Sequence, residues 1–325
     1  MKKSLVLLVG IAAALCSFGL RAQTAHDANV WLRKIYHATS HLSYTGTFVY
    51  QDGQRSEASR VTHLVDASGD YDKLEALDGA EREVVRFKDE VKCYLPGSQT
   101  VKIDKRTAAR SFPALLPAQI SSLAENYRIT KGGSARIANL DCQEILLTPK
   151  DAMRYGYQLW ADKTSGMLLR ARVFNDKGET VEQFTFTQLH VGSRPGRDRV
   201  RSALEARSKD WRVEQAAVEP ANLAAAGWTV KAPIPGFHKV AEVMRMLRES
   251  RRVGQTVFSD GLAAVSVFIE PLAGRAEPLQ TGLSTIGAVN IYSREVANHA
   301  VTVVGEAPAA SVQRIAYTVE YRPPQ

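Results

Sequence analysis

Histidine is the residue type in this chain whose spacing comes nearest to a catalytic or metal site. His37 and His41 stand four residues apart in a stretch of helical periodicity, which would place both imidazoles on one face. No neighbouring acid or cysteine completes a ligand set, so we expect no metal. The chain also has no HExxH, GxSxG, P-loop or strand-linked GxGxxG motif. These residues favour a binding protein without catalytic residues or a cofactor over an enzyme.

Two cysteines, Cys93 and Cys142, remain once the N-terminal leader described below is removed. An even pair in an oxidising compartment predicts a disulfide. Two buried free thiols fit the same sequence, because cysteine is among the residues most often buried. The two cysteines form no CxxC motif, which excludes a thiol oxidoreductase and a cysteine zinc site.

The first 22 residues have the features of a cleaved export signal. Lys2 and Lys3 precede an apolar run from Leu5 to Leu20, and small residues follow near Ala22. Cys16 raises the alternative of a lipoprotein, but Leu15 precedes it where a small residue is required. We therefore expect residues 1–22 to be a signal peptide and the mature protein to be soluble in the periplasm.

Composition narrows the class of protein further. Hydrophobic residues make up 45% of the chain and charged residues 23%, which is typical of a globular protein and excludes a disordered one. The net charge is +8, and three of the positive charges belong to the leader. The remaining surplus suits an acidic peptide or anionic lipid and is too small to indicate nucleic-acid binding.

The elements that position these residues are mostly short strands. Ala25–Leu42 predicts one helix with Trp31, Ile35, Ala38 and Leu42 on its buried face. Alternating runs separated by Asp-Gly, Ser-Gly and Pro-Gly turns then predict an antiparallel meander. We expect a turn at Gly132-Gly133 and a strand over Ala138–Thr148. The pattern indicates an α+β fold in which one large curved antiparallel sheet fails to close and helices fill its concave side.

Apolar and aromatic side chains are abundant on these strands and on the loop Ser111–Pro117. A curved sheet that does not close leaves a cavity, and an apolar cavity in an exported protein suits acyl chains. The alternative is an ordinary packed core under the helices. The candidates for a lipid cavity are Phe48, Tyr50, Val85, Phe87, Tyr94, Leu95, Phe112, Leu115 and Leu116.

A basic stretch separates the first unit, residues 23–191, from a second unit, residues 213–325. We interpret residues 192–212 as a linker, and its seven bases indicate either plain solvation or a phosphate site. The second unit shows six further strand-like runs and ends in a helix that Pro308 opens. Five bases on or beside the predicted strand Lys239–Leu247 are candidates for an acidic or phosphate-bearing partner, although a charged strand edge explains them equally well. They are Lys239, Arg245, Arg248, Arg251 and Arg252.

Several blocks of this sequence resemble the MucB/RseB family. The resemblance is carried by Tyr44–Tyr50, Leu77–Arg86, Asp89–Pro96 and Leu147–Trp160, and it extends to the last helix. It implies a large domain like that of the lipoprotein carriers LolA and LolB, an unclosed barrel plugged by helices. It implies in addition a smaller C-terminal sheet domain that docks an anti-sigma factor.

The resemblance implies a periplasmic negative regulator of the envelope stress response. Such a protein binds the periplasmic region of an anti-sigma factor of the RseA or MucA type and shields it from regulated proteolysis. Lipid signals such as lipopolysaccharide release it, and members self-associate. A lipid or lipoprotein carrier would use the same first domain, but it would leave the second domain unexplained.

Overall fold

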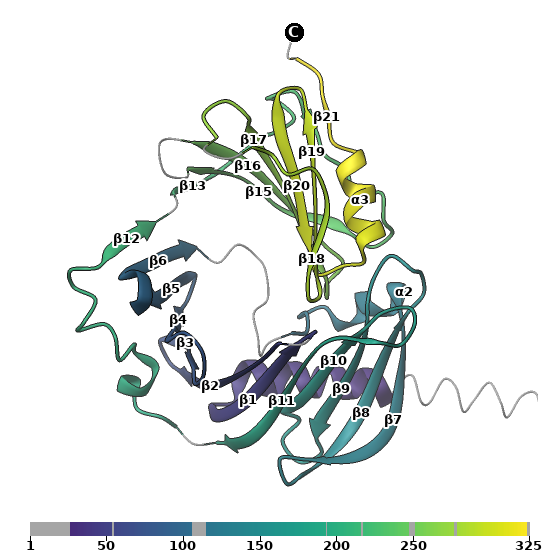
Figure 1. The fold of residues 1–325 in the computed structure, drawn as a ribbon. Helices are drawn as coiled ribbons and strands as arrows, with labels where there is room; N and C mark the ends of the chain where they lie inside the picture. Colours follow the sequence, from purple (N-terminus) through teal and green to yellow (C-terminus); the bar gives the residue numbers. More distant parts are fainter. Residues whose placement is uncertain are drawn as a thin grey trace, which may run out of the picture.

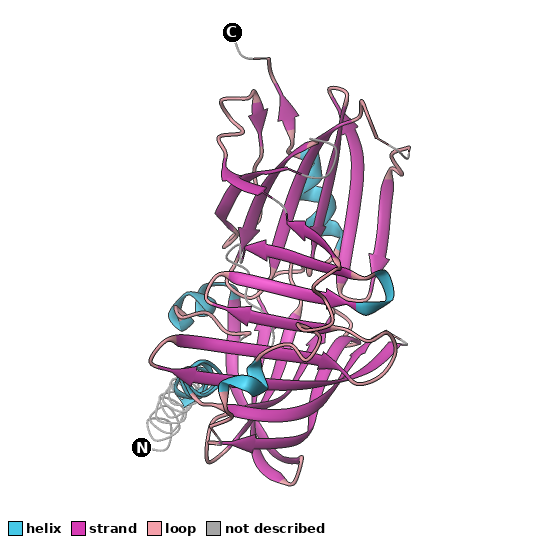
Figure 2. Ribbon diagram, turned by 90° about the vertical axis from the view of Figure 1, so that its left-hand side faces the viewer, coloured by secondary structure: helices cyan, strands magenta, loops and turns pink. Residues whose placement is uncertain are grey.

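The computed structural model describes residues 27–53, 55–105, 115–192, 194–215, 217–246, 251–275 and 278–323, most of them in β-strands (Figure 1). The predicted leader with Cys16, the loop residue Phe112 and the basic residue Arg248 lie outside the described residues. None of the described helices is long and apolar enough to cross a membrane. Figure 2 shows the two large sheets one above the other.

The first sheet has twelve strands in the order β12-β6-β5-β4-β3-β2-β1-β11-β10-β9-β8-β7. Among its described pairings only that of β12 with β6 is parallel. Because β12 and β7 end the sheet without pairing with each other, it does not close into a barrel. The strands are β1 (Tyr44–Asp52), β2 (Arg55–Asp66), β3 (Gly69–Ala76), β4 (Glu83–Phe87), β5 (Glu90–Leu95), β6 (Thr100–Lys105), β7 (Tyr127–Ile137), β8 (Leu140–Pro149), β9 (Gly156–Asp162), β10 (Leu168–Phe174), β11 (Thr180–Val191) and β12 (Arg212–Gln215).

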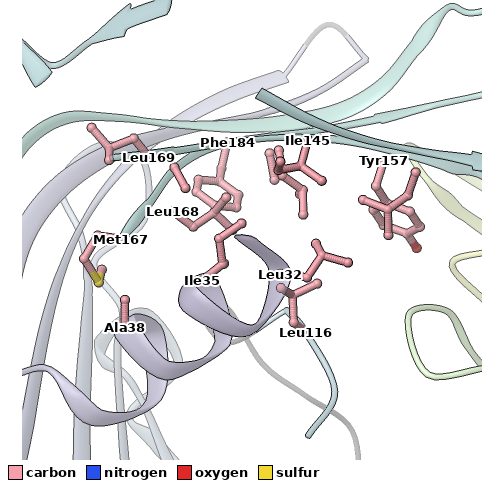
Figure 3. Packing of buried hydrophobic residues seen from close by; sticks show 14 of the residues in the cluster. Leu32, Ile35, Ala38, Leu116, Ile145, Tyr157, Met167, Leu168, Leu169 and Phe184 are labelled. Atoms are coloured by element: carbon pink, nitrogen blue, oxygen red, sulfur yellow. The ribbon is translucent and has the colours of Figure 1, made fainter. Parts of the chain in front are cut away.

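One helix, over residues 27–41, fills the concave side of this sheet. Its fully buried apolar residues are Ala28, Leu32, Ile35 and Ala38, and they point toward strand side chains such as Phe184 (Figure 3). Trp31 and Leu42, predicted on the buried face, are only partly buried at its margin. The expected unclosed sheet with a helix against it is confirmed. A short helix, α2 (Leu123–Asn126), follows the 3-10 turn η2 (Ile120–Ser122) and adds Leu123 to the same core.

The second sheet has seven strands in the order β13-β15-β16-β17-β20-β19-β18. Helix α3 (Ala309–Tyr317) packs on one face and buries Val312, Ile315 and Ala316 among the sheet's valines. The predicted smaller antiparallel sheet with a terminal helix is confirmed. Its strands are β13 (Ala217–Pro220), β15 (His238–Met246), β16 (Arg252–Ser259), β17 (Ala264–Pro271), β18 (Gly282–Ile286), β19 (Val289–Val296) and β20 (His299–Gly305), while β14 (Trp228–Thr229) pairs with β21 (Glu320–Tyr321) beside it.

One local prediction is wrong, and the strand predicted over Ala138–Thr148 begins two residues later, at Leu140. Gly132 and Gly133 form no turn but an irregular part of β7, where the Gln143 amide donates to both of their carbonyl oxygens. The Glu144 side chain lies 2.4 Å from where a Cβ of residue 132 would stand, so a larger residue here would have to displace it. The turn comes instead at Ala138 and Asn139, which both adopt positive φ.

The basic segment 194–212 lies against the first sheet. Glu83, a buried acid at the start of β4, accepts hydrogen bonds from the Ser202 hydroxyl at 2.5 Å and from the Ala203 backbone N–H at 2.9 Å. Leu204 packs with Tyr94 and Val101 in a small core of its own. The segment therefore runs along the first sheet before the chain crosses to β13, and the domain limits given above stay a prediction.

Leu32→Ala should lower the free energy of unfolding by about 3 kcal/mol, because Leu32 is fully buried and the truncated side chain leaves a cavity in the core. Val30→Ala on the same helix is the matched control, since 45% of Val30 is exposed and the change should cost well under 1 kcal/mol. Urea denaturation followed by circular dichroism measures both. Equal losses for the two variants would contradict the packing described here.

Candidate functional site

Eight of the nine residues predicted to line a lipid cavity are described, and these eight lie in separate places and do not line one common cavity. Phe48 and Leu116 are buried in the core under the helix. Tyr94 is buried in the small core beside the basic segment, and Val85 packs against it.

The remaining described members of that set lie in other surroundings. Phe87 stacks on Tyr71 with ring centroids 4.2 Å apart, and Leu95 is half-buried at the end of β5. Tyr50 and Leu115, by contrast, line a cavity of about 170 Å³ between the two sheets. The helix fills the interior where the sequence predicts the cavity, and this cavity lies instead at the seam between the sheets.

The seam holds two adjoining cavities. The first, of about 170 Å³, is lined from the first sheet by apolar residues such as Val173 and Phe184. The second, of about 240 Å³, is lined by Val257, Val304 and other residues of the second sheet. Leu262 and Glu306 line both. The largely apolar lining is suited to an apolar side chain or a short stretch of acyl chain.

The β16–β17 turn that carries Leu262 is held by Asp260. One carboxylate oxygen of Asp260 accepts hydrogen bonds from the backbone N–H groups of Leu262 and Ala263, both at 2.9 Å. Gly261 adopts a φ of +104°, a conformation that favours glycine. This turn therefore presents Leu262 to both cavities in a defined orientation.

The other carboxylate oxygen of Asp260 forms a fully buried ion pair with Arg154, at 2.7 Å. Arg154 lies between β8 and β9, so the pair joins the two sheets. The guanidinium also binds Asp151 at 3.0 Å and the Pro235 carbonyl at 2.5 Å. The Tyr127 hydroxyl donates to Asp260 at 3.1 Å, and burial raises the pKa of Tyr127, which keeps that proton in place.

Two further hydrogen bonds join the residues beside Arg154 to the second sheet. The Ser311 hydroxyl of α3 donates to the Met153 carbonyl at 2.6 Å, and the Asn290 amide donates to the Tyr155 hydroxyl at 3.0 Å. Buried polar groups that are all paired tolerate few other arrangements. These contacts therefore fix the walls of the seam cavities.

Carboxyl groups line the edge of the smaller cavity. The Tyr50 hydroxyl donates to Glu182 at 2.7 Å, and burial, together with the nearby Glu306 and Asp52, raises the pKa of Glu182 to about 7. Desolvation also raises the pKa of Glu306. When Glu182 is neutral, the cavity accepts apolar groups more easily. When Glu182 is ionised, its charge repels anions.

The four basic partner candidates that the structure describes make separate contacts. Lys239 pairs with Glu242 at 2.8 Å, Arg251 pairs with Glu270 at 2.8 Å, and Arg252 is exposed. Arg245 binds Gln255 and Asp104. The alternative of a free strand edge is wrong over Val243–Met246, because β15 lies there between β13 and β16.

The predicted disulfide is also wrong: Cys93 and Cys142 are free thiols. Cys93 lies on β5 and Cys142 on β8, and seven strands separate these two in the sheet. Neighbouring strands are about 4.8 Å apart, so the two sulfurs lie far beyond bonding distance. Burial raises the pKa of both thiols, to about 11 for Cys142, which keeps them protonated and unreactive.

The histidine pair forms part of no metal site. His37 and His41 stack with ring centroids 4.6 Å apart, and His41 makes a hydrogen bond to the His37 carbonyl. Within the part of the chain that the structure describes, no group of three or more His, Cys, Asp or Glu residues is placed to hold a metal ion.

Sequence reasoning missed the residues that build the seam. Asp260-Gly261 is visible in the sequence as a hairpin turn, but nothing there pairs Asp260 with an arginine 106 positions away. Glu182 lies on the same face of β11 as Phe184 and Phe186. A glutamate on an otherwise apolar face of a strand was the signal in the sequence that could have identified it.

Comparisons with known proteins agree with this architecture. A family model for the MucB/RseB N-terminal domain matches residues 27–210, and one for the MucB/RseB C-terminal domain matches residues 222–320. The chain is 31% identical to the sigma factor AlgU regulatory protein MucB of Pseudomonas aeruginosa, over 97% of this chain and 96% of that protein. It is 25% identical to the sigma-E factor regulatory protein RseB of Escherichia coli K12, over 98% of both chains.

The crystal structure of MucB in complex with MucA(peri) is similar to this chain with a TM-score of 0.69 and 29% identity, covering 93% of this chain and 99% of that one. A crystal structure of MucB alone gives a TM-score of 0.67 at 28% identity, covering 91% of this chain and 98% of the other. The similarity therefore spans both sheets and the seam between them.

Arg154→Met should lower the free energy of unfolding by about 3–5 kcal/mol, because it leaves the Asp260 carboxylate buried without its partner. The double variant Arg154→Met, Asp260→Leu should recover part of that loss. Lys239→Gln, which breaks the exposed pair with Glu242, is the control and should cost less than 1 kcal/mol. Chemical denaturation measures all three, and an Arg154 variant as stable as the control would contradict the role of the pair.

Stability should fall as the pH rises from about 4.5 to about 7, because the folded protein holds a proton on Glu182 that the unfolded chain releases. For this half-buried group the loss is on the order of 2 kcal/mol. Glu182→Gln should remove the part of this pH dependence of stability that Glu182 causes. Glu125→Gln, at an exposed position, should leave the pH dependence unchanged. Thermal unfolding between pH 4 and 8 decides this, and parallel curves for wild type and Glu182→Gln would contradict it.

Proposed function

The chain belongs to the MucB/RseB family, and from that premise we propose that it regulates a sigma factor by binding the periplasmic region of a membrane anti-sigma factor of the MucA/RseA type. The observation that carries the proposal is the match of both family domains together with the similarity to MucB in complex with MucA(peri) over 93% of the chain. Relatives along the full length are themselves sigma factor regulatory proteins. The function is regulation by binding, and it requires no catalysis.

In this proposal the bound protein shields the anti-sigma factor from regulated proteolysis, and a lipid such as lipopolysaccharide releases it. The apolar seam cavities support a lipid response, since they lie where the two sheets meet and border the contacts that join them. A ligand that enters there favours whichever arrangement of the sheets accommodates it better. The difference between the ligand's affinities for the two arrangements sets how far it weakens partner binding. Each tenfold weakening requires about 1.4 kcal/mol of that difference.

The proposal assigns the protein to the periplasm, after cleavage of residues 1–22. Residues 23–191 would sense the lipid, residues 192–212 would link the units, and residues 213–325 would carry most of the anti-sigma contact. The mature protein would associate with copies of itself. The buried pair Arg154–Asp260 crosses this division, so the intact chain is the material for its tests.

The mature chain should bind the anti-sigma factor's periplasmic segment saturably, and added lipopolysaccharide should weaken that binding at least tenfold. Leu262→Ser should reduce the lipid effect and keep the partner affinity, since Leu262 lines both seam cavities. Leu283→Ser is the control, because Leu283 is 45% exposed on the edge strand β18. Isothermal titration measures both effects.

Absence of partner binding would contradict the regulatory proposal. Co-purified lipid in a protein that binds no partner would favour a lipid or lipoprotein carrier instead. Binding that lipopolysaccharide leaves unchanged would contradict only the lipid response.

A further inference from the structure

The face of the first sheet opposite the helix carries a hollow of about 750 Å³. It is separate from the seam cavities, with which it shares no lining residue. Its volume lies in the range of small-molecule binding sites. The hollow lies between strands β11, β1, β2 and β3 and the basic segment that follows β11.

Strand register builds the floor of this hollow from two rows of polar side chains. In one row Gln188, Thr47, Arg60 and Glu75 are cross-strand neighbours on β11, β1, β2 and β3. The second row, one step along the strands, contains His190, Thr45, Thr62 and Lys73. Cross-strand neighbours on one face lie close enough for a single ligand to touch several of them. The floor therefore offers hydroxyl, amide and cationic groups side by side.

The wall is the segment over residues 194–203, which includes the 3-10 turn η3 (Arg197–Val200). Three contacts hold it against the sheet. Arg197 pairs with Asp66 at 2.8 Å, Val200 is buried, and the Ser202 hydroxyl donates to Glu83. Because these contacts hold the wall, its remaining side chains lie at the edge of the hollow even when no ligand is bound.

Positive charge dominates the lining. Five cationic residues stand against two acidic ones, Glu75 and Asp198. Lys73 is neutralised by Glu75 and Glu83 at 3.2 and 3.3 Å. Among the described residues, no carboxylate lies within ion-pair distance of Arg194, Arg199 or Arg201. Three guanidinium groups thus remain available for an anion, and guanidinium binds phosphate and carboxylate oxygens in a bidentate manner.

We propose that this hollow binds an acidic saccharide, a polyhydroxylated ligand that carries phosphate or carboxylate groups. The arginines of the wall bind the anionic groups, and the threonine hydroxyls and Gln188 of the floor bind the sugar hydroxyls. The described lining contains no Val, Leu, Ile, Phe, Tyr or Trp, which disfavours an acyl chain here. This site goes beyond the proposed regulatory function and does not depend on partner binding.

The test uses the mature chain and isothermal titration at low salt with four probes: glucose 1-phosphate, trigalacturonate, inorganic phosphate and neutral maltotriose. We expect at least one of the two acidic saccharides to bind, and the one that binds identifies the anionic group. That saccharide should bind at least tenfold more tightly than inorganic phosphate or maltotriose. Its affinity should fall as sodium chloride is added, because screening weakens the contacts to exposed arginines.

The double variant Arg199→Gln, Arg201→Gln should weaken saccharide binding at least tenfold, and Gln188→Ala should weaken it as well. All three positions are exposed, so the variants should keep the wild-type unfolding temperature. Arg128→Gln, an exposed arginine on β7 outside the hollow, is the matched control and should bind like wild type. Equal binding of maltotriose and the acidic saccharides would overturn the proposal. So would inorganic phosphate bound as tightly as glucose 1-phosphate and trigalacturonate, or binding that the wall variants leave unchanged.

Discussion

The buried ion pair between Arg154 and Asp260 constrains how the two sheets can meet. A charge removed from water is very costly unless it is paired, so the two sheets can close only in an arrangement that brings these residues together. The same aspartate closes the turn that carries Leu262, and the same arginine is held by Asp151 and Pro235. Because both charged groups are fully buried, an arrangement of the sheets that separated them would leave each charge without a partner.

The unclosed first sheet creates a second constraint. Twelve curved strands leave a concave apolar face, and the helix over residues 27–41 covers it with side chains that have no exposed surface. Because that interior is occupied, the apolar cavities found among the described residues lie where the sheet meets its neighbour. The seam is therefore both the joint between the two units and the place of these two cavities.

The two faces of the same strands serve different chemistry. On β1, Tyr44, Phe48 and Tyr50 face the helix and the seam, while Thr45 and Thr47 face the basic segment. On β11 a bulge opposite Thr47 and Phe48 shifts the alternation by one residue. Phe184 and Phe186 point inward, and beyond the bulge Gln188 and His190 point outward. Strict alternation would have buried both of these polar residues.

The sequence by itself determined the elements and the fold class. Helical spacing in Ala25–Leu42, the alternating runs and the glycine-containing turns are local patterns, and local patterns follow from backbone geometry and the burial of one face. The blocks that resemble the MucB/RseB family were visible for the same reason, since they are contiguous.

Only the tertiary structure decided the contacts between distant segments. It placed Arg154 beside Asp260, separated Cys93 from Cys142 by seven strands, and gathered the arginines of residues 194–201 over the threonines of β1 and β2. The physical reason is that such contacts depend on strand order, sheet curvature and single-residue bulges. A one-residue change of register turns a side chain to the other face, and no composition or spacing records that change.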